Sequence, residues 1–251
     1  MAAILNGIRI WAAALACAIY WGVGGGLFLL VGMVLGPILP EKVGRRVGGG
    51  LIQGAFAGFV MLLRVFGIAH CRMIGFEKLK EVNGAFILAP NHPAIWDAVF
   101  ILAKQGGLTC ILKASLLKNP LTMGGARLAR FIPNEPAVEM VKKCVKSLEE
   151  GRALLLFPEG TRTWRREGVV NEFRGGVAIL ARQTRLPVYP VFVSTTTFFG
   201  AKGTPAWRPD PARSDITMLL GDPLVCGEQE SSHDFLERLR AEYIRALSRP
   251  S

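Results

Sequence analysis

The sequence predicts an α/β protein with a mixed sheet flanked by helices, preceded by an N-terminal hydrophobic helical membrane anchor. Three observations support this fold class. A long uncharged run comes first, short apolar segments typical of buried strands follow it, and amphipathic segments typical of helices separate those strands. We therefore divide the 251 residues into a membrane-anchoring segment, residues 1–71, and an α/β domain, residues 72–251.

The N-terminal segment is long and apolar enough to enter a bilayer. No charged residue occurs from Ile10 to Pro40, a run of 31 positions, or from Val47 to Leu63, a run of 17. A helix of about 20 apolar residues crosses the hydrocarbon core, so the first run can span and the second is borderline. A cleaved signal peptide is the alternative, but its apolar core of roughly 7–15 residues is shorter than the first run. We therefore expect a retained anchor.

The topology of this anchor follows from charge and glycine content. The loop EKVGRR, residues 41–46, carries three basic residues against one acidic residue. Basic residues tend to stay on the cytoplasmic side, whereas a simple two-span hairpin would place this loop on the other side. The glycine cluster GVGGG, residues 22–26, predicts a break in the first run. These features favour a re-entrant or interfacial anchor in the cytoplasmic membrane, with the following domain facing the cytoplasm.

Charge and cysteine content narrow the classes of partner. The net charge is +11, which suits anionic lipid headgroups or an acidic carrier protein. Basic and aromatic residues do not interleave and zinc-ligand spacings are missing, so we expect no nucleic-acid partner. Five cysteines without CxxC spacing indicate reduced thiols, and three scattered histidines predict no metal site.

The second domain alternates between predicted strands and helices. Apolar runs bounded by Pro, Gly or polar residues predict strands within residues 84–90, 108–113, 152–158, 186–193 and 216–223. Predicted helices begin near Pro93 and cover residues 136–150, 175–184 and 231–248. The last of these follows a Ser cap and has one apolar face, so we expect it to be structural.

Polar residues follow two of the predicted strands. Asn91 and His92 come after FILAP, and the segment EGTR, residues 159–162, comes after LLLFP. Ligands bind beyond the carboxyl ends of strands in open sheets of this kind. We therefore expect both segments at a binding site, with the basic, Pro-rich loop of residues 200–213 beside it.

His92 and Asp97 have the spacing H-x4-D. A neutral imidazole can remove a proton from an alcohol near neutral pH, and a carboxylate on its other nitrogen fixes the tautomer. The alternative is that His92 caps the helix that begins near Pro93, with Asp97 favouring the positive end of that helix. The spacing alone leaves both interpretations open.

Arg162 and Glu159 suggest contacts with a polar substrate. The guanidinium of Arg162 offers a fork of donors suited to phosphate. Glu159 could accept bonds from substrate hydroxyls or orient Arg162. A surface salt bridge in a turn is the alternative.

Four ordered segments resemble those of one family. They are NHPAIWD, LKASLLKNPLTMGGARLARFIP, FPEGTR and LPVYPV. In this order and spacing, over about residues 72–225, they resemble the PlsC-type glycerolipid acyltransferases typified by 1-acylglycerol-3-phosphate acyltransferase. The hydrophobic N-terminus also suits members of this family.

The resemblance implies a membrane-bound O-acyltransferase of phospholipid biosynthesis. His92 would be the general base and Asp97 its partner, with the acyl group passing directly from acyl-CoA or acyl carrier protein (acyl-ACP) to a lysophospholipid hydroxyl. No cofactor beyond this co-substrate is implied. The resemblance assigns substrate binding to Asn91, Lys113, Glu159, Gly160, Thr161 and Arg162, and it does not identify the oxyanion donors.

One departure from the family pattern concerns the acceptor. Many members that use lysophosphatidate carry an Arg shortly after the FI of the second segment, where this chain has Asn134. The segments KASLLKNP and FIPN also resemble those of acyltransferases associated with bacterial aryl-polyene pigment lipids. The acceptor therefore stays open between a lysophospholipid and another lipid alcohol, and a catalytically silent lipid-binding protein is the alternative of another class.

Overall fold

The computed structural model describes residues 1–164, 169–197, 199–204 and 212–248, so residues 205–211 of the predicted loop lie outside the described residues. The helices are α1 (Ala2–Ile38), α2 (Glu41–Val65), α3 (Asp97–Lys104), α4 (Pro120–Leu128), α5 (Ala137–Glu149), α6 (Gly176–Thr184) and α7 (Ser232–Leu247), with short 3₁₀ helices η1 (Phe76–Lys80) and η2 (Ala114–Leu117). The strands are β1 (Ala69–Ile74), β2 (Ile87–Pro90), β3 (Thr109–Leu112), β4 (Ile132–Pro133), β5 (Leu154–Leu155), β6 (Val188–Thr195) and β7 (Ser214–Leu220).

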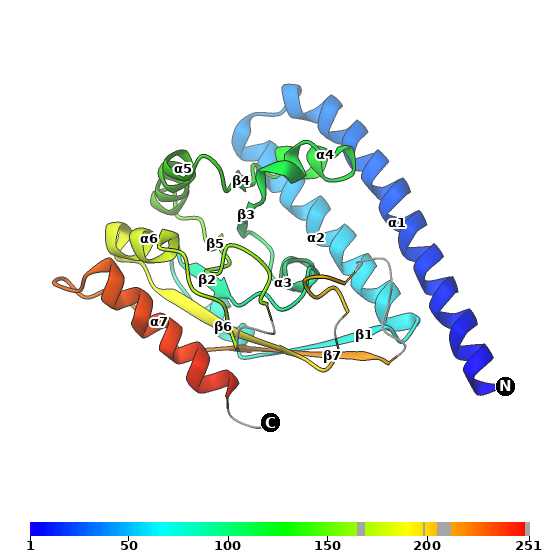
Figure 1. The fold of residues 1–251 in the computed structure, drawn as a ribbon. Helices are drawn as coiled ribbons and strands as arrows, with labels where there is room; N and C mark the ends of the chain where they lie inside the picture. The colour runs from blue at the N-terminus through cyan, green and yellow to red at the C-terminus, as the bar shows by residue number, and fades with distance from the viewer. Residues whose placement is uncertain (165–168, 198, 205–211, 249–251) are drawn as a thin grey trace.

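Within these described ranges, seven strands form one sheet in the order β1-β7-β6-β2-β5-β3-β4 (Figure 1). Neighbouring strands pair in parallel except β6 and β7, which are antiparallel. The sheet is therefore mixed, as predicted. The carboxyl ends of β6, β2, β5, β3 and β4 all lie at one edge, where the expected polar segments emerge.

Apolar side chains pack on both faces of this sheet. Alternate residues of β2 point to opposite sides, as strand geometry requires. Leu88 joins a core with Phe59 of α2 and the apolar residues of α3. Ile87 joins a second core with Leu239 of α7 and the buried residues of α5 and α6. Helices on both faces confirm the predicted α/β class.

The observed elements agree with most of the predicted ones. The five predicted strands correspond to β2, β3, β5, β6 and β7, and α7 begins after the Ser231 cap, whose hydroxyl accepts the Asp234 amide. The helix expected near Pro93 instead begins at Asp97, because residues 93–96 form a turn. Strand β1 was missed because only Ala69 of its six residues is buried. The division at residues 71 and 72 stays a prediction, and residue 71 lies inside β1.

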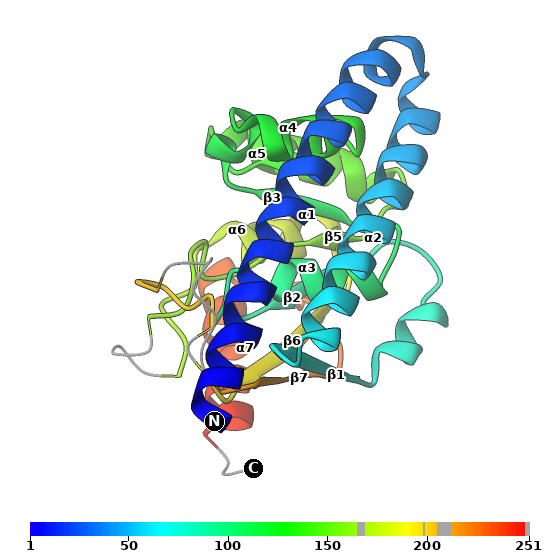
Figure 2. The same cartoon turned by 90° about the vertical axis from the view of Figure 1, so that its right-hand side faces the viewer.

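The two N-terminal helices form an antiparallel hairpin (Figures 1 and 2). Helix α1 continues through residues 22–26, so the predicted break at the glycine cluster is wrong. Glycine at Gly25 and Gly32 instead allows close packing on α4. A Cβ at Gly25 would lie 2.8 Å from the Leu121 backbone, and one at Gly32 would lie 2.7 Å from the Gly124 carbonyl oxygen.

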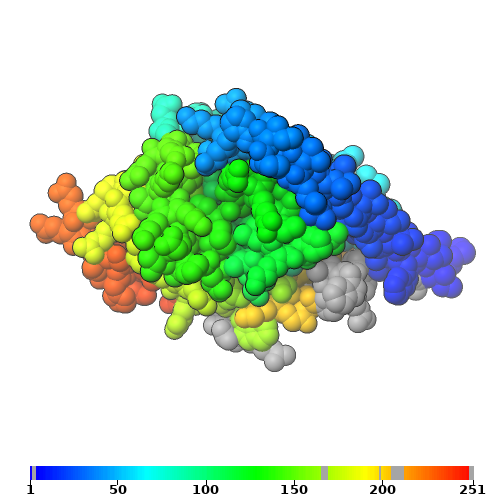
Figure 3. Space-filling view, turned by 90° about the horizontal axis from the view of Figure 1, so that it is seen from above, coloured from blue at the N-terminus to red at the C-terminus, as the bar shows by residue number. Residues whose placement is uncertain are grey.

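The outer face of α1 is a continuous apolar surface. The 37-residue α1 and the 25-residue α2 are each long and apolar enough to cross a membrane by length and composition alone. Only 6% of the apolar window of α1 is buried, which distinguishes it from a core helix. In Figure 3 the two helices run along one side of the molecule. The exposed side chains recur every three or four residues, at Ile8, Trp11, Leu15, Ile19, Val23, Leu27 and Leu30.

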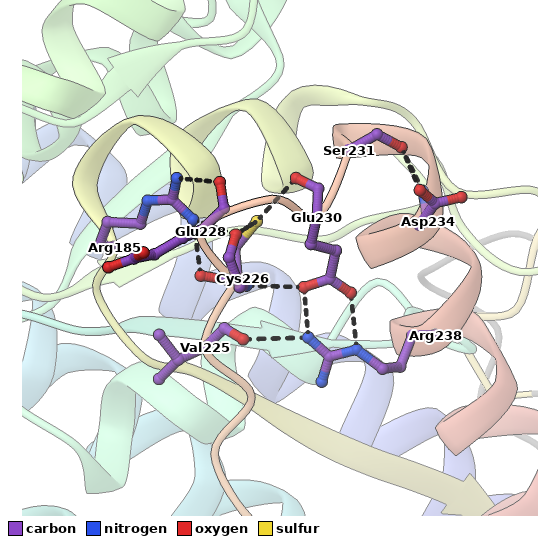
Figure 4. Close-up of polar contacts among 9 residues, drawn as sticks. Arg185, Val225, Cys226, Glu228, Glu230, Ser231, Asp234 and Arg238 are labelled. Carbon is purple, nitrogen blue, oxygen red and sulfur yellow. Dashed lines mark hydrogen bonds and ion pairs between the residues drawn. The ribbon is translucent and has the colours of Figure 1, made fainter.

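An ionic clamp holds the connection between β7 and α7 (Figure 4). The Glu230 carboxylate accepts two hydrogen bonds from Arg238, of 2.8 and 2.7 Å, and Arg238 also donates to the Val225 carbonyl. Arg185, just after α6, donates to the Glu228 carbonyl at 3.1 Å. The Arg238 guanidinium is the main reason that the pKa of Glu230 falls to about 2. These bonds fix α7 against the sheet.

Candidate active site

The two predicted polar segments meet at the carboxyl ends of β2 and β5. These strands are parallel neighbours, so their following residues emerge at the same edge of the sheet. The backbone N–H of His92 donates to Glu159 Oε1 at 2.9 Å. The backbone N–H of Thr163 donates back to the His92 carbonyl at 2.7 Å. The structure therefore brings the H-x4-D and EGTR segments into direct contact, as predicted.

His92 and Asp97 form a hydrogen-bonded pair. His92 Nδ1 lies 3.0 Å from Asp97 Oδ2, which also accepts the backbone N–H of Ala94 at 2.8 Å. An ionised carboxylate can only accept, so this contact favours the tautomer with the proton on Nδ1. That tautomer leaves Nε2 as the basic nitrogen.

The helix-capping interpretation of His92 is not supported. The N-cap residue of α3 is Trp96, which makes no side-chain cap bond, and Asp97 is the first residue of the helix. The turn through Pro93 and Ala94 brings Asp97 back beside the imidazole. His92 therefore lies outside the helix, and its ring contacts Asp97 instead of the helix N–H groups.

The surroundings of the pair are apolar and nearly closed on the Asp97 side. Asp97 is 1% exposed, and burial raises its pKa, while the hydrogen bonds from His92 and Ala94 oppose that increase. The His92 ring stacks on Phe157, with centroids 4.1 Å apart. The imidazole is therefore held in one orientation from two sides.

Glu159 is buried, and its carboxylate oxygens bond to the protein. It is 2% exposed. Besides the His92 amide, Oε1 accepts the Thr163 hydroxyl at 2.7 Å, and Oε2 accepts the Asn171 backbone N–H at 3.0 Å. A buried carboxylate needs internal donors and has them here. Glu159 holds the His92 backbone in this structure, and its contact with substrate stays a prediction.

Asn91 is also bonded within the protein, and its contact with substrate stays a prediction. It is 2% exposed, its amide nitrogen donates to the Val193 carbonyl at 2.9 Å, and its oxygen accepts the Val193 N–H at 2.7 Å. The side chain thus replaces a missing pair of ladder bonds between the end of β2 and β6. It fixes the backbone just before His92.

Arg162 lies close to the His92–Asp97 pair. Its Nη1 donates to the carbonyls of Gly200 and Ala201, at 3.0 and 3.1 Å, and its charge helps to lower the pKa of Asp97. Among the described residues, its Nε and Nη2 groups have no hydrogen-bond partner. They remain available for an anionic ligand.

The other three predicted residues are exposed. Gly160 has φ +63°, a conformation that favours glycine, and Thr161 follows it at the surface. Lys113 follows β3 at the same edge of the sheet, two strands away from β2. The sheet order therefore places Lys113 further from His92 than the EGTR segment.

Several residues around the site were missed by the sequence analysis. Tyr243 of α7 donates its hydroxyl hydrogen bond to the Ala89 carbonyl at the end of β2. Trp96 stacks on Trp21 of α1 and on Phe199, with centroids 6.4 and 5.7 Å apart. The sequence analysis assigned no role to Trp96 within NHPAIWD, and no motif marks Tyr243, because their contacts connect segments far apart in the chain.

Comparison with known proteins agrees with this geometry. Residues 70–194, about half of the chain, match the model of a family described as Acyltransferase, and this stretch contains both NHPAIWD and FPEGTR. The chain belongs to the acyltransferase family. Membership of this family supports an acyltransferase enzyme and argues against the silent lipid-binding alternative.

Curated relatives match this acyltransferase over most of their own length. A protein of Helicobacter pylori named 1-acyl-sn-glycerol-3-phosphate acyltransferase is 27% identical over 68% of this chain and 74% of its own. A protein of the same name from Limnanthes douglasii is 27% identical over 86% of this chain and 76% of its own.

The fold of this acyltransferase also has a solved counterpart. The crystal structure of the 1-acyl-sn-glycerophosphate acyltransferase PlsC from Thermotoga maritima matches with a TM-score of 0.73, over 98% of this chain and 97% of that one. The sequences are 19% identical, so this likeness supports the fold alone. It includes the N-terminal helices as well as the sheet.

Proposed function

We propose that this acyltransferase moves a fatty acyl group from acyl-CoA or acyl-ACP to the free hydroxyl of 1-acylglycerol 3-phosphate, as its relatives' names describe. The observation that carries the proposal is the His92–Asp97 pair, whose 3.0 Å contact leaves Nε2 as the base beside the EGTR segment. Membership of the family supplies the reaction class, and the curated relatives supply the substrate class.

The reaction needs no covalent enzyme intermediate. Nε2 of His92 accepts the proton of the acceptor hydroxyl as its oxygen bonds to the thioester carbonyl carbon. The resulting imidazolium is stabilised by Asp97, to which Nδ1 donates. When the carbon–sulfur bond breaks, the imidazolium returns the proton to the thiolate, giving the free thiol and the new ester.

Glu159 and Arg162 have different parts in this proposal. Glu159 holds the His92 backbone, so it acts as a positioning residue. Arg162 offers its unpaired guanidinium N–H groups to the acceptor phosphate, which suits a planar donor fork. Gly160, Thr161 and Lys113, exposed along the same edge, complete the proposed acceptor surface.

We place the enzyme at the cytoplasmic face of a membrane. The apolar outer face of α1 supports an interfacial anchor, since its exposed side chains repeat along the helix. Both donors are cytoplasmic thioesters, and the five free cysteines suit a reducing compartment. The acceptor lipid would then reach the site from the bilayer.

The identity of the acceptor has a second candidate because of Asn134. Its side-chain oxygen accepts the Ala114 backbone N–H at 3.0 Å and holds the corner between β3 and η2. This contact supplies no cation for phosphate where the family resemblance implies an Arg. A hydroxylated aryl-polyene lipid is therefore the alternative acceptor.

An activity assay that combines each acyl donor with each acceptor lipid tests the proposal. The purified full chain in vesicles is given palmitoyl-CoA or palmitoyl-ACP with lysophosphatidate, lysophosphatidylcholine or a hydroxylated aryl-polyene lipid, and thiol release and product ester are measured. We expect lysophosphatidate-dependent thiol release and phosphatidate. Transfer to the polyene alone would support the alternative acceptor, and no transfer with any pair would contradict the proposal.

A further inference from the structure

A basic pocket lies beside the EGTR segment, on the side where α7 approaches it. The pocket has a volume of about 590 Å³. Three cationic side chains line it, from Arg174 before α6, from Lys202 in the loop after β6, and from Arg240 of α7. The rest of the wall includes Thr161, the Asn171 segment and two carboxylates, the buried Glu159 and the exposed Glu172. Elements distant in the sequence therefore converge on one concave surface.

Each cation is placed by a specific contact. The Arg174 side chain crosses directly over Gly160, where an added Cβ would lie 2.6 Å from Arg174 Cδ. The Arg174 amide donates to the Pro158 carbonyl at 2.7 Å. Lys202 Nζ lies 4.7 Å from the centroid of the Trp164 ring. The missing side chain at Gly160 therefore leaves room for the Arg174 side chain.

In the part of the chain that the structure describes, the three cations outnumber the two carboxylates of the wall and form no ion pair with them. There, no carboxylate lies within ion-pair distance of Arg174, Lys202 or Arg240. Arg240 Nε is buried, and no hydrogen-bond acceptor reaches it in those residues. A buried donor without a partner is unfavourable, so an anion that entered this pocket would satisfy it.

Phosphate is the anion that fits this arrangement best. Two guanidinium groups present planar forks that match phosphate oxygens, and an ammonium adds a third donor group. The pocket also adjoins the site through Glu159, whose two oxygens bond the amides of His92 and Asn171, at 2.9 and 3.0 Å. A phosphate held here would belong to a molecule that extends toward His92.

We propose that this pocket binds a phosphate group of one of the two substrates. The identity of those substrates rests on the proposed function. Coenzyme A carries a diphosphate and a ribose 3′-phosphate at a distance from its thioester, whereas lysophosphatidate carries its phosphate close to the reacting hydroxyl. Both sources offer the same chemistry to Arg174, Lys202 and Arg240.

Direct binding tests the pocket without depending on turnover. Isothermal titration of the full chain with coenzyme A, dephospho-coenzyme A and glycerol 3-phosphate is compared between the native chain and the double variant Arg174→Gln, Arg240→Gln. A matched control, Lys78→Gln with Lys80→Gln, removes two exposed charges on η1. Circular dichroism verifies the fold, and if the double variant does not fold, Lys202→Gln replaces it.

We expect the double variant to raise the Kd of one phosphate ligand about 10- to 100-fold, with the control unchanged. A loss confined to coenzyme A assigns the pocket to the donor, and a loss confined to glycerol 3-phosphate assigns it to the acceptor. Unchanged affinity for both, or no binding of either by the native chain, overturns the proposal. Binding that depends on the pocket in a chain that transfers no acyl group would overturn only the proposed function.

Discussion

His92 is fixed by three neighbours, two at its imidazole ring and one at its backbone. Asp97 bonds Nδ1, Phe157 stacks on the ring, and Glu159 accepts the backbone N–H of the same residue. Each neighbour lies in NHPAIWD or FPEGTR, two of the segments that carry the family resemblance. The H-x4-D spacing gave the His92–Asp97 contact as one of two interpretations, and the contacts of His92 with Phe157 and Glu159 were not predicted.

The actual roles of Asn91 and Glu159 could not be predicted in the same way. Both residue types bind substrates in many sites, and only burial distinguishes a substrate contact from an internal one. Asn91 and Glu159 are each 2% exposed, and their side chains bond the protein backbone. Burial depends on how β6 and the Asn171 segment pack, which no local pattern shows.

Replacing Glu159 by Gln should destabilise the protein and lower turnover. The new amide N–H₂ group would face donors at one of the carboxylate positions, where Asn171 or His92 already presents an N–H. We expect a loss of about 1–3 kcal/mol in the free energy of unfolding, measured by urea denaturation. Glu77→Gln, at an exposed position, is the control, and equal stability of the two variants would contradict the account.

Close helix packing accounts for two of the glycines of α1, Gly25 and Gly32. Helix α1 crosses α4 where Gly32 and Gly124 face each other, so backbones meet where side chains usually separate them. The sequence analysis identified the apolar runs but not this contact, because α4 was not predicted. Glycine content alone does not distinguish a break from a close approach.

Replacing Gly124 by Ala should weaken the contact between α1 and α4. The added Cβ would lie 2.1 Å from the Phe28 carbonyl oxygen, which forces the helices apart. We expect the free energy of unfolding to fall by about 1–3 kcal/mol in thermal or urea unfolding.

The control for this change is Gly50→Ala on α2, where nothing lies within 4 Å of the new Cβ. There the higher helix propensity of Ala should stabilise the protein by up to about 1 kcal/mol. If both variants are equally stable, the close approach of α1 and α4 does not contribute to the free energy of unfolding.

The clamp on α7 should make stability depend on acid pH. Arg238 lowers the pKa of Glu230 from 4.5 to about 2, so the folded protein favours the ionised carboxylate. The resulting stabilisation is present above pH 4.5 and is lost as pH falls through about 2. We expect the Tm difference between the native chain and Glu230→Gln to shrink over that range. A constant difference would contradict this, and Glu149→Gln, at an exposed site, is the control.

At the scale of the whole molecule, the two N-terminal helices and the site belong to one packed unit. Trp96, between His92 and α3, contacts Trp21 of α1 and Phe59 of α2. The sequence analysis treated the anchor and the α/β domain as separate segments. Their contacts are between aromatic residues far apart in the chain, which no periodicity predicts.

The apolar face of α1 should determine membrane binding. Replacing Leu15 and Leu27 by Asp puts charge on side chains that are 63% and 62% exposed. If these side chains enter the bilayer, vesicle flotation should show binding weakened at least about 100-fold, since each buried Leu contributes about 1.5–3 kcal/mol. Val138→Asp with Val225→Asp, on other exposed surfaces, is the control, and equal loss in both variants would argue against an interfacial α1.

The central claim is that His92 removes the proton of the acceptor hydroxyl. The measurement is the turnover of acyl-CoA or acyl-ACP with the acceptor by purified His92→Ala, with circular dichroism and coenzyme A binding to show that the protein is folded. We predict that turnover falls by about 10²- to 10⁴-fold while coenzyme A binding stays the same. Near-normal acyl transfer by the folded variant would contradict the account.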